Sequence, residues 1–275
     1  MTKTALVTGA SSGIGEETAR TLHQLGYTVY AAARRTDRLQ KLANGGIHTL
    51  AMDVTDDKSM TSGIDSIIAE TGRIDVLVNN AGYGSYGAIE DVPLDEARRQ
   101  FEVNLFGLGR LTQLVLPHMR AQKFGTIINI SSMGGRLTTP LGGWYHATKY
   151  AVEALSDALR METAPFGINV VVIEPGGIRT EWSGIAADHL EETAEGSAYA
   201  SQIKAVANSM RSESTNNRQS PPSVIADTVE KIVTARKPRT RYVVGFAAKP
   251  LVTLRRILPD RAFDHVISAA LGVRR

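Results

Sequence analysis

The sequence predicts an α/β protein built on a doubly wound, mostly parallel sheet of seven strands, with helices on both faces and a single domain. Seven short apolar runs alternate with amphipathic segments of helical length. The runs are rich in Val, Ile and Ala and show little polar alternation, which is typical of parallel strands covered on both faces. With 275 residues, 43% of them hydrophobic, the chain is long enough for one large core.

The elements follow one another regularly as far as Pro175. The expected strands are ALVTGA, YTVYAAA, IHTLAMD, IDVLVNN, GTIINIS, INVVVIEP and RYVVGF, and the helical patterns between them include 57–71, 94–119 and 146–165. Such an alternation predicts right-handed crossovers between parallel strands.

The regular alternation breaks between residues 176 and 220, where no strand is expected and Ser, Glu, Asn and Ala are frequent. Pro221-Pro222 marks the place where a further helix should begin. We interpret about 178–220 as a substrate lid with short helices of its own, because long connections in compact domains are usually functional. We therefore expect one domain over 1–275, with a C-terminal extension over about 246–275.

Composition excludes several classes of function. The chain has no cysteine, hence no disulfide and no thiolate nucleophile. It has no apolar run of 18 residues and no charged-then-apolar leader, so we expect a soluble cytoplasmic protein without stable membrane insertion.

The net charge of +3 hides a basic C-terminal end, where Lys231 to Arg275 carries eleven Lys and Arg against two Asp. An acidic lipid surface or a nucleic acid is one possible partner for that end. We interpret the charges as a solvated face and expect no nucleic acid.

A glycine-rich turn, Thr8-Gly9-Ala10-Ser11-Ser12-Gly13-Ile14-Gly15, follows the first strand directly. Gly9 permits a tight turn, Gly13 allows the backbone to approach a pyrophosphate, and Gly15 allows a helix to pack closely on the strand. A P-loop is disfavoured because no Lys-Ser or Lys-Thr pair follows the last glycine. At the first strand–helix junction of such a chain, this turn predicts a dinucleotide site.

The end of the second strand indicates which dinucleotide binds. An NAD site would place an acidic side chain there to bind the ribose 2′-hydroxyl, but the strand ends in Ala33 and continues with Arg34 and Arg35. Guanidinium groups bind phosphate with paired hydrogen bonds, so we expect NADP(H). The alternative is that both arginines cap a loop in solvent and that the cofactor is NAD(H).

Tyr145 and Lys149 lie four residues apart, on one face of an expected helix. A phenol with a pKa near ~10 exchanges protons poorly at neutral pH, and a nearby ammonium stabilises its phenolate. A serine at the end of the strand GTIINIS can polarise a substrate oxygen, and both Ser131 and Ser132 are candidates. By itself a Tyr/Lys pair at this spacing is more often a surface pair.

These motifs together resemble the short-chain dehydrogenase/reductase family, whose members have a Rossmann-type fold. The resemblance covers residues 3 to about 180. Its motifs occur in the family's order: the TGASSGIG turn, Asp53-Val54, Asn79-Asn80-Ala81-Gly82, Asn104, Ser132, Tyr145-xxx-Lys149, and Pro175-Gly176-Gly177 with Thr180.

The resemblance implies roles for the matching residues. Tyr145 is the acid/base, Lys149 also binds the nicotinamide ribose, and Asn104 holds a water in a proton relay, unless it is only a buried amide. Ser132 is preferred to Ser131 because it lies thirteen residues before the tyrosine.

The residues expected to bind the cofactor are Gly9, Ser11, Ser12, Gly13, Ile14, Gly15, Arg34, Arg35, Asp53, Val54, Asn80, Ala81, Gly82, Tyr145, Lys149, Pro175, Gly176, Ile178 and Thr180. One departure is that Ser12 occupies a position where many NADP-preferring relatives have a basic residue.

The expected activity is NADP(H)-dependent interconversion of a ketone or aldehyde and an alcohol. Apolar residues before the tyrosine and in the lid favour a medium-to-large apolar substrate: Met133, Leu137, Leu141, Trp144, Trp182, Ile185, Leu190, Tyr199, Ile203 and Met210. The alternatives are an NAD-linked alcohol dehydrogenase and a non-catalytic NADP(H)-binding sensor or scaffold. No histidine fits a metal arrangement, and the resemblance implies a homodimer or homotetramer.

Overall fold

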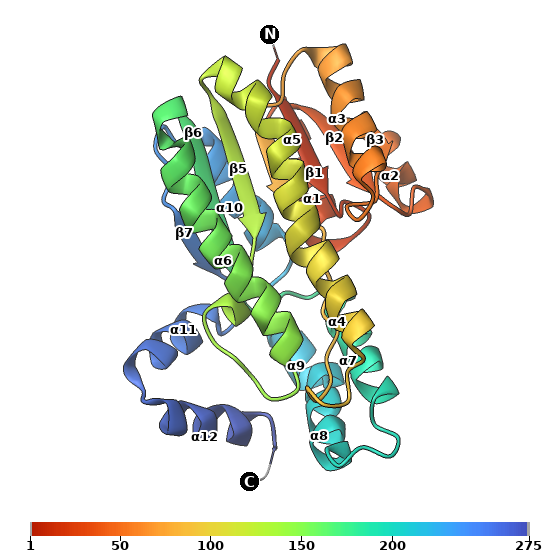
Figure 1. The fold of residues 1–275 in the computed structure, drawn as a ribbon, viewed down its shortest axis with the longest axis vertical. Coiled ribbons are helices and arrows are strands. Elements are labelled where there is room, and N and C mark those ends of the chain that lie inside the picture. Colours follow the sequence, from red (N-terminus) through yellow and green to blue (C-terminus); the bar gives the residue numbers. More distant parts are fainter. Residues whose placement is uncertain (1, 274–275) are drawn as a thin grey trace.

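The structure, a computed structural model, describes residues 2–273 and contains one parallel sheet of seven strands in the order β3-β2-β1-β4-β5-β6-β7 (Figure 1). The strands are β1 Thr4–Thr8, β2 Thr28–Ala33, β3 His48–Ala51, β4 Val76–Asn79, β5 Gly125–Ile130, β6 Ile168–Pro175 and β7 Arg241–Val244. Six of the seven lie within the predicted apolar runs, and β1 begins one residue before its run. The predicted doubly wound fold is confirmed.

Helices cover both faces of the sheet. The described helices are α1 Gly13–Gln24, α2 Gln40–Ala43, α3 Asp57–Thr71, α4 Leu94–Phe101, α5 Gly107–Gln122, α6 Gly143–Thr163, α7 Trp182–Glu192, α8 Ala200–Arg211, α9 Glu213–Arg218, α10 Ser223–Thr234, α11 Ala248–Ile257 and α12 Asp260–Ala270. Helices α1, α2 and α10 pack on one face, and α3, α5 and α6 on the other.

Strand β1 shows why the strands lack polar alternation. Successive side chains of a strand point to opposite faces. Ala5 and Val7 therefore enter the core beneath α1 and α10, whereas Leu6 enters the core beneath α3 and α5. All three are fully buried, so both faces of the strand select apolar residues.

The helix predicted over 57–71 begins and ends where its capping residues place it. The Asp56 side chain accepts hydrogen bonds from the backbone N–H groups of Lys58 and Ser59, and Gly72 ends the helix with a φ of 72°. The helix predicted over 94–119 is instead two α-helices joined by a π-helical segment, Glu102–Phe106. That interruption belongs to the candidate site described below.

Two segments beyond the sheet lie at the carboxyl ends of the strands, at the bottom of Figure 1. The predicted lid contains α7, α8 and α9, and α10 begins at Ser223, directly after the proline pair. The C-terminal extension forms α11 and α12. Its side chains Phe263 and Ile267 pack with Leu137 in one core cluster, and Val273 joins the core of the lid.

Within residues 2–273, no helix is long and apolar enough to cross a membrane. The described basic residues of the C-terminal end lie on both sides of β7 along the chain. Arg236, Lys237 and Arg239 precede β7, whereas Arg256 and Arg261 lie beyond its other end, in the extension. The strand therefore separates the two groups along the sheet.

Candidate active site

A cavity with a volume of about 500 Å³ lies at the carboxyl ends of the strands. Strand β1 has β2 on one side and β4 on the other, so the crossovers diverge here and leave a crevice, as in other open α/β sheets. Every residue predicted to bind the cofactor lines this cavity except Gly15. Gly15 lies behind the turn, where a Cβ would overlap the carbonyl oxygen of Gly9.

The glycine-rich turn owes its shape to two residues with left-handed backbones. Gly9 has a φ of 64° and Gly13 a φ of 56°, a region that side chains disfavour. A Cβ on Gly13 would lie 2.9 Å from Cγ2 of Thr180, across the cavity. The Asn80 amide holds the turn by donating to the carbonyl oxygens of Thr8 and Gly9, at 2.9 and 3.2 Å. The turn is thus a rigid cradle with its backbone exposed to the cavity.

The end of β2 presents cations to the same cavity. Arg34 and Arg35 are exposed and line it, and neither forms an ion pair with a described residue. Arg38 differs, because its guanidinium lies 2.7 Å from the carboxylate of Glu181. The Asp53 carboxylate accepts from the backbone and hydroxyl of Thr55, so it stays within its own loop.

Tyr145, Ser132 and Lys149 meet in this cavity. Ser132 follows β5, and its hydroxyl accepts from the backbone N–H of Gly134 at 3.0 Å. The Lys149 ammonium donates to the carbonyl oxygen of Ile130 at 2.9 Å and lies 5.9 Å from the centroid of the Tyr145 ring. Ser131 also lines the cavity, but its hydroxyl is buried without a hydrogen-bond partner among the described residues.

Burial changes the acidity of both groups. It raises the pKa of Tyr145 to about 12, against a smaller lowering by the hydrogen bond to Ser132. Burial also lowers the pKa of Lys149 to about 8, and the negative charge of Glu153 opposes that lowering. Both shifts have the sign expected when a low-dielectric site disfavours charge.

Asn104 lies in the π-helical segment and does not line the cavity. Its amide accepts from the backbone N–H of Tyr83 at 3.0 Å and donates to the carbonyl of Tyr83 at 2.9 Å and the hydroxyl of Thr148 at 3.1 Å. These bonds fix the loop after β4 to α6. The prediction of one continuous helix around Asn104 is wrong, because a π-helical segment interrupts it. In the wider turn of that segment, the Asn104 amide points at the loop after β4.

His146, which follows the tyrosine, faces the core. Its Nδ1 lies 3.0 Å from the carbonyl oxygen of Gly134, and its Nε2 accepts from the backbone N–H of Thr139 at 3.1 Å. Burial lowers its pKa, consistent with a neutral ring. The histidine therefore holds the loop that follows Ser132 in place through these hydrogen bonds.

An aromatic cluster covers the tyrosine. The ring centroids of Tyr86 and Trp182 lie 5.6 and 5.3 Å from that of Tyr145. Tyr86 belongs to the loop after β4, where it has no motif neighbours, so the sequence offered no signal for it. Trp182 was among the predicted lid residues, and with Ile185 it lines the cavity.

The expectation for Met133 and Leu137 needs correction. Both were expected to lie near the reacting carbonyl, but they pack against the C-terminal extension in the cluster of Phe263 and Ile267. Neither lines the cavity. Of the other predicted apolar residues, Trp182 and Ile185 line the cavity, and Leu141, Leu190, Tyr199, Ile203 and Met210 belong to the lid core. Trp144, which was also expected near the reacting carbonyl, belongs to neither group.

This fold, with a glycine-rich turn at the point where the strand order diverges, defines the class of Rossmann-type dinucleotide-binding proteins. A family model described as short chain dehydrogenase matches residues 3–190. The chain belongs to the short-chain dehydrogenase/reductase family of oxidoreductases.

Relatives match over nearly the whole chain. A probable short-chain type dehydrogenase/reductase, VdlC of Helicobacter pylori, is 34% identical over 98% of this chain and 99% of its own. The 3-ketodihydrosphingosine reductase of Bacteroides thetaiotaomicron is 35% identical over 98% of both chains. The NADPH-dependent 3-dehydrocapnine reductase of Ornithobacterium rhinotracheale is 36% identical over 95% of both.

Solved structures agree with the fold. A short-chain dehydrogenase from Streptomyces avermitilis superposes with a TM-score of 0.82 at 32% identity, over 100% of this chain and 99% of that one. A metagenomic short-chain oxidoreductase in complex with NADP gives a TM-score of 0.69 at 27% identity, over 88% of this chain and 96% of that one. The first match includes the C-terminal extension.

Proposed function

We propose that this protein is an NADP(H)-dependent oxidoreductase that interconverts a ketone or aldehyde and an alcohol, with a medium-to-large apolar substrate. The observation that carries the proposal is the meeting of Tyr145, Ser132 and Lys149 in the same cavity as the glycine-rich turn. A phenol, a hydroxyl and an ammonium supply a proton donor, a polarising group and a positive charge to one reacting oxygen.

In reduction, the Tyr145 phenol donates its proton to the carbonyl oxygen, and the Ser132 hydroxyl hydrogen-bonds that same oxygen. Bound NADPH supplies the hydride that the carbonyl carbon accepts. The charged Lys149 stabilises the phenolate left on Tyr145. Alcohol oxidation reverses these proton movements, with Tyr145 accepting the proton.

The residues around the turn fit NADP(H). The exposed backbone of Gly9 and Gly13 and the amino end of α1 suit a pyrophosphate. Arg34 and Arg35 have no carboxylate partner among the described residues, which leaves them available for a 2′-phosphate. One relative is named as NADPH-dependent, and one matched structure contains NADP.

Two observations support an apolar substrate. Trp182 and Ile185 line the cavity on the side of Tyr145 and give it an apolar wall, a surface suited to apolar ligands. Two relatives are named as reductases of 3-ketodihydrosphingosine and of 3-dehydrocapnine. We place the substrate of this chain among ketones of that general kind.

We also propose a homodimer or homotetramer. Among the described residues, α5 and α6, with the π-helical segment before α5, expose four large apolar or aromatic side chains, Phe106, Tyr150, Leu155 and Met161. Exposed apolar surface of this kind favours self-association. Sedimentation equilibrium tests the assembly, and a monomeric mass at micromolar concentration contradicts it.

The test of the activity is reduction of a panel of apolar ketones and aldehydes, followed at the nicotinamide absorbance with NADPH and NADH in parallel. Ser132→Ala and Ser131→Ala form a matched pair, because both serines line the cavity. We expect NADPH-preferring turnover that falls strongly in Ser132→Ala and little in Ser131→Ala. Bound NADPH without turnover of any panel member would favour a sensor over an enzyme.

A further inference from the structure

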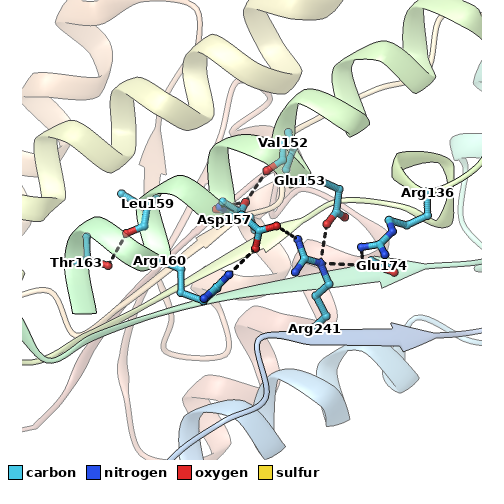
Figure 2. A network of polar contacts seen from close by, with 11 residues as sticks. Arg136, Val152, Glu153, Asp157, Leu159, Arg160, Thr163, Glu174 and Arg241 are labelled. Carbon is cyan, nitrogen blue, oxygen red and sulfur yellow. Dashed lines mark hydrogen bonds and ion pairs between the residues drawn. The ribbon is translucent and has the colours of Figure 1, made fainter. Parts of the chain in front are cut away.

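A pair of buried carboxylates, Glu153 and Glu174, lies outside the lining of the cavity. Figure 2 shows both side chains. Glu153 lies on α6, one turn after Lys149, and Glu174 lies near the end of β6. Their exposed fractions are 6% and 1%. Buried carboxylates are costly unless they are paired, so their partners decide what they do.

Arg241, the first residue of β7, holds both carboxylates. Its Nε donates to Oε2 of Glu153 at 3.0 Å and lies 3.3 Å from Oε1 of Glu174. Its Nη2 donates to Asp157 at 2.7 Å, which lowers the pKa of Asp157 to about 2. Arg136 approaches Glu174 from the loop after β5, at 3.6 Å. Arg160 also pairs with Asp157, at 2.8 Å, so three arginines face the three carboxylates. Figure 2 shows this arrangement.

The cluster is in contact with the segments that carry the reactive groups. Gly135 lies between them, because a Cβ there would be 2.8 Å from Oγ of Ser131, 2.9 Å from the carbonyl oxygen of Lys149 and 3.0 Å from Cγ of Glu153. No side chain fits in that space. The cluster, α6 and the loop after β5 are therefore packed together without a gap.

Charged and titratable groups from three elements lie around Lys149. On its own helix it faces Tyr145 and Glu153, and beyond Glu153 lie Glu174 on β6 and the two arginines from β7 and the loop after β5. Burial and the charge of Glu153 raise the pKa of Glu174 to about 7. Glu153 is the buried carboxylate nearest the lysine along α6, and its ion pair with Arg241 fixes its position.

We propose that Glu153 is a positioning residue that keeps Lys149 in its charged form, and that Arg241 holds Glu153 in place for this task. The site is thereby coupled to β7, an edge strand that contributes nothing to the motifs around the cavity. The catalytic consequence rests on the proposed function, but the electrostatic coupling belongs to the protein without any ligand.

The direct test is an NMR titration of Lys149 in the full-length, ligand-free protein labelled with ¹³C-lysine, with the signal assigned by its loss in Lys149→Met. Removing the charge in Glu153→Gln should lower the pKa of Lys149 by about one unit, because an opposite charge one turn away favours the ammonium. Asp157→Asn is the matched control. It removes another carboxylate that contacts Arg241, one turn further along α6, and should leave the titration unchanged.

A second readout is the pH profile of kcat/KM for reduction with NADPH. Its alkaline limb should move to lower pH in Glu153→Gln by the same amount as the NMR titration, and Glu153→Asp, which keeps the charge, should recover most of the shift. Thermal unfolding identifies any variant that fails to fold. A Lys149 titration that is identical in Glu153→Gln and wild type overturns the proposal, as does an equal shift in Asp157→Asn.

The two readouts separate the two proposals. A shifted Lys149 titration in a protein that reduces no carbonyl compound supports the coupling and contradicts the proposed function. Carbonyl reduction with an unshifted titration does the reverse.

Discussion

The two ends of the cavity are built in different ways. At the cofactor end, the contact surface is backbone, shaped by Gly9 and Gly13 and held by the Asn80 amide. At the substrate end, the surface consists of large side chains from distant segments, with Trp182 and Ile185 of the lid in the same cavity as Tyr145. A surface made of backbone needs particular residues at fixed spacing, whereas a surface made of side chains needs only apolar volume.

Substitutions at the two ends should therefore have different effects on activity. A substitution at the cofactor end changes a turn and should affect every substrate alike. A substitution at the substrate end changes a volume and should discriminate between substrates. The four predictions below test that contrast, from the largest expected effect to the smallest.

Tyr145→Phe removes the proton donor at the boundary of the two ends. We expect kcat for every carbonyl substrate to fall by about 10³-fold, within the range typical of general acid catalysis, while NADPH binding changes little. Tyr150→Phe, on the same helix but exposed, is the control and should retain activity. Steady-state kinetics and NADPH fluorescence titration measure both quantities. Comparable losses in the two variants would contradict the role of Tyr145.

The double variant Arg34→Ala/Arg35→Ala should affect the cofactor end alone. Loss of charge-assisted bonds to a 2′-phosphate should raise KM for NADPH by about 10- to 100-fold and leave KM for NADH almost unchanged. Arg38→Ala is a suitable control, since that arginine is paired with Glu181. An equal rise in KM for both cofactors would remove the argument for NADP(H).

Glu174→Gln should change how stability depends on pH. The pKa of Glu174 is raised from 4.5 to about 7, so the fold prefers its protonated form and loses stability as the pH rises from about 4.5 to 7. Glutamine imitates the protonated form. The variant should therefore gain stability relative to wild type between pH 5 and 8, on the order of 1–2 kcal/mol. Urea unfolding at several pH values measures this, and a constant difference would show that Glu174 does not titrate in this range.

Trp182→Ala should affect the substrate end alone. Loss of the indole should raise KM for bulky apolar ketones several-fold, with little change for a small aldehyde, because only the larger substrate contacts the lid. Phe246→Ala, an exposed aromatic side chain outside the cavity lining, serves as a control. If Trp182→Ala changes KM equally for large and small substrates, the lid does not select by size.

Much of the fold could be predicted from the sequence, because both faces of the sheet are buried. Leu6 and its neighbours had to be apolar, and Asp56 and Gly72 mark the ends of α3 by their own hydrogen bonding and backbone. The π-helical segment around Asn104 was not accessible. It differs from an α-helix by one extra residue in a turn, and no residue type specifies that change.

The candidate site could be predicted from the sequence where the backbone needs a particular residue type at a fixed position. The glycines of the turn were predicted on that basis, whereas most other cofactor residues were implied by the resemblance to the family, and the structure places all of them except Gly15 on the cavity. The partners of Leu137 were not accessible, because its apolar side chain fits the cavity wall and the extension equally well, and only the packing of Phe263 decides. The contact between Arg241 and Glu153 could not be predicted either, because it depends on the pairing of β7 with β6.

The lid core can be completed only late in synthesis of the chain. It contains Tyr86, Tyr145, Ala186 and Val273, so it draws on residues almost two hundred positions apart. Domains are synthesised from the N-terminus, and six of the seven strands are available once Pro175 has emerged from the ribosome. The cover over the tyrosine has to wait for the last helix. A nascent chain can thus complete most of its sheet while the reactive end of the molecule is still open to water.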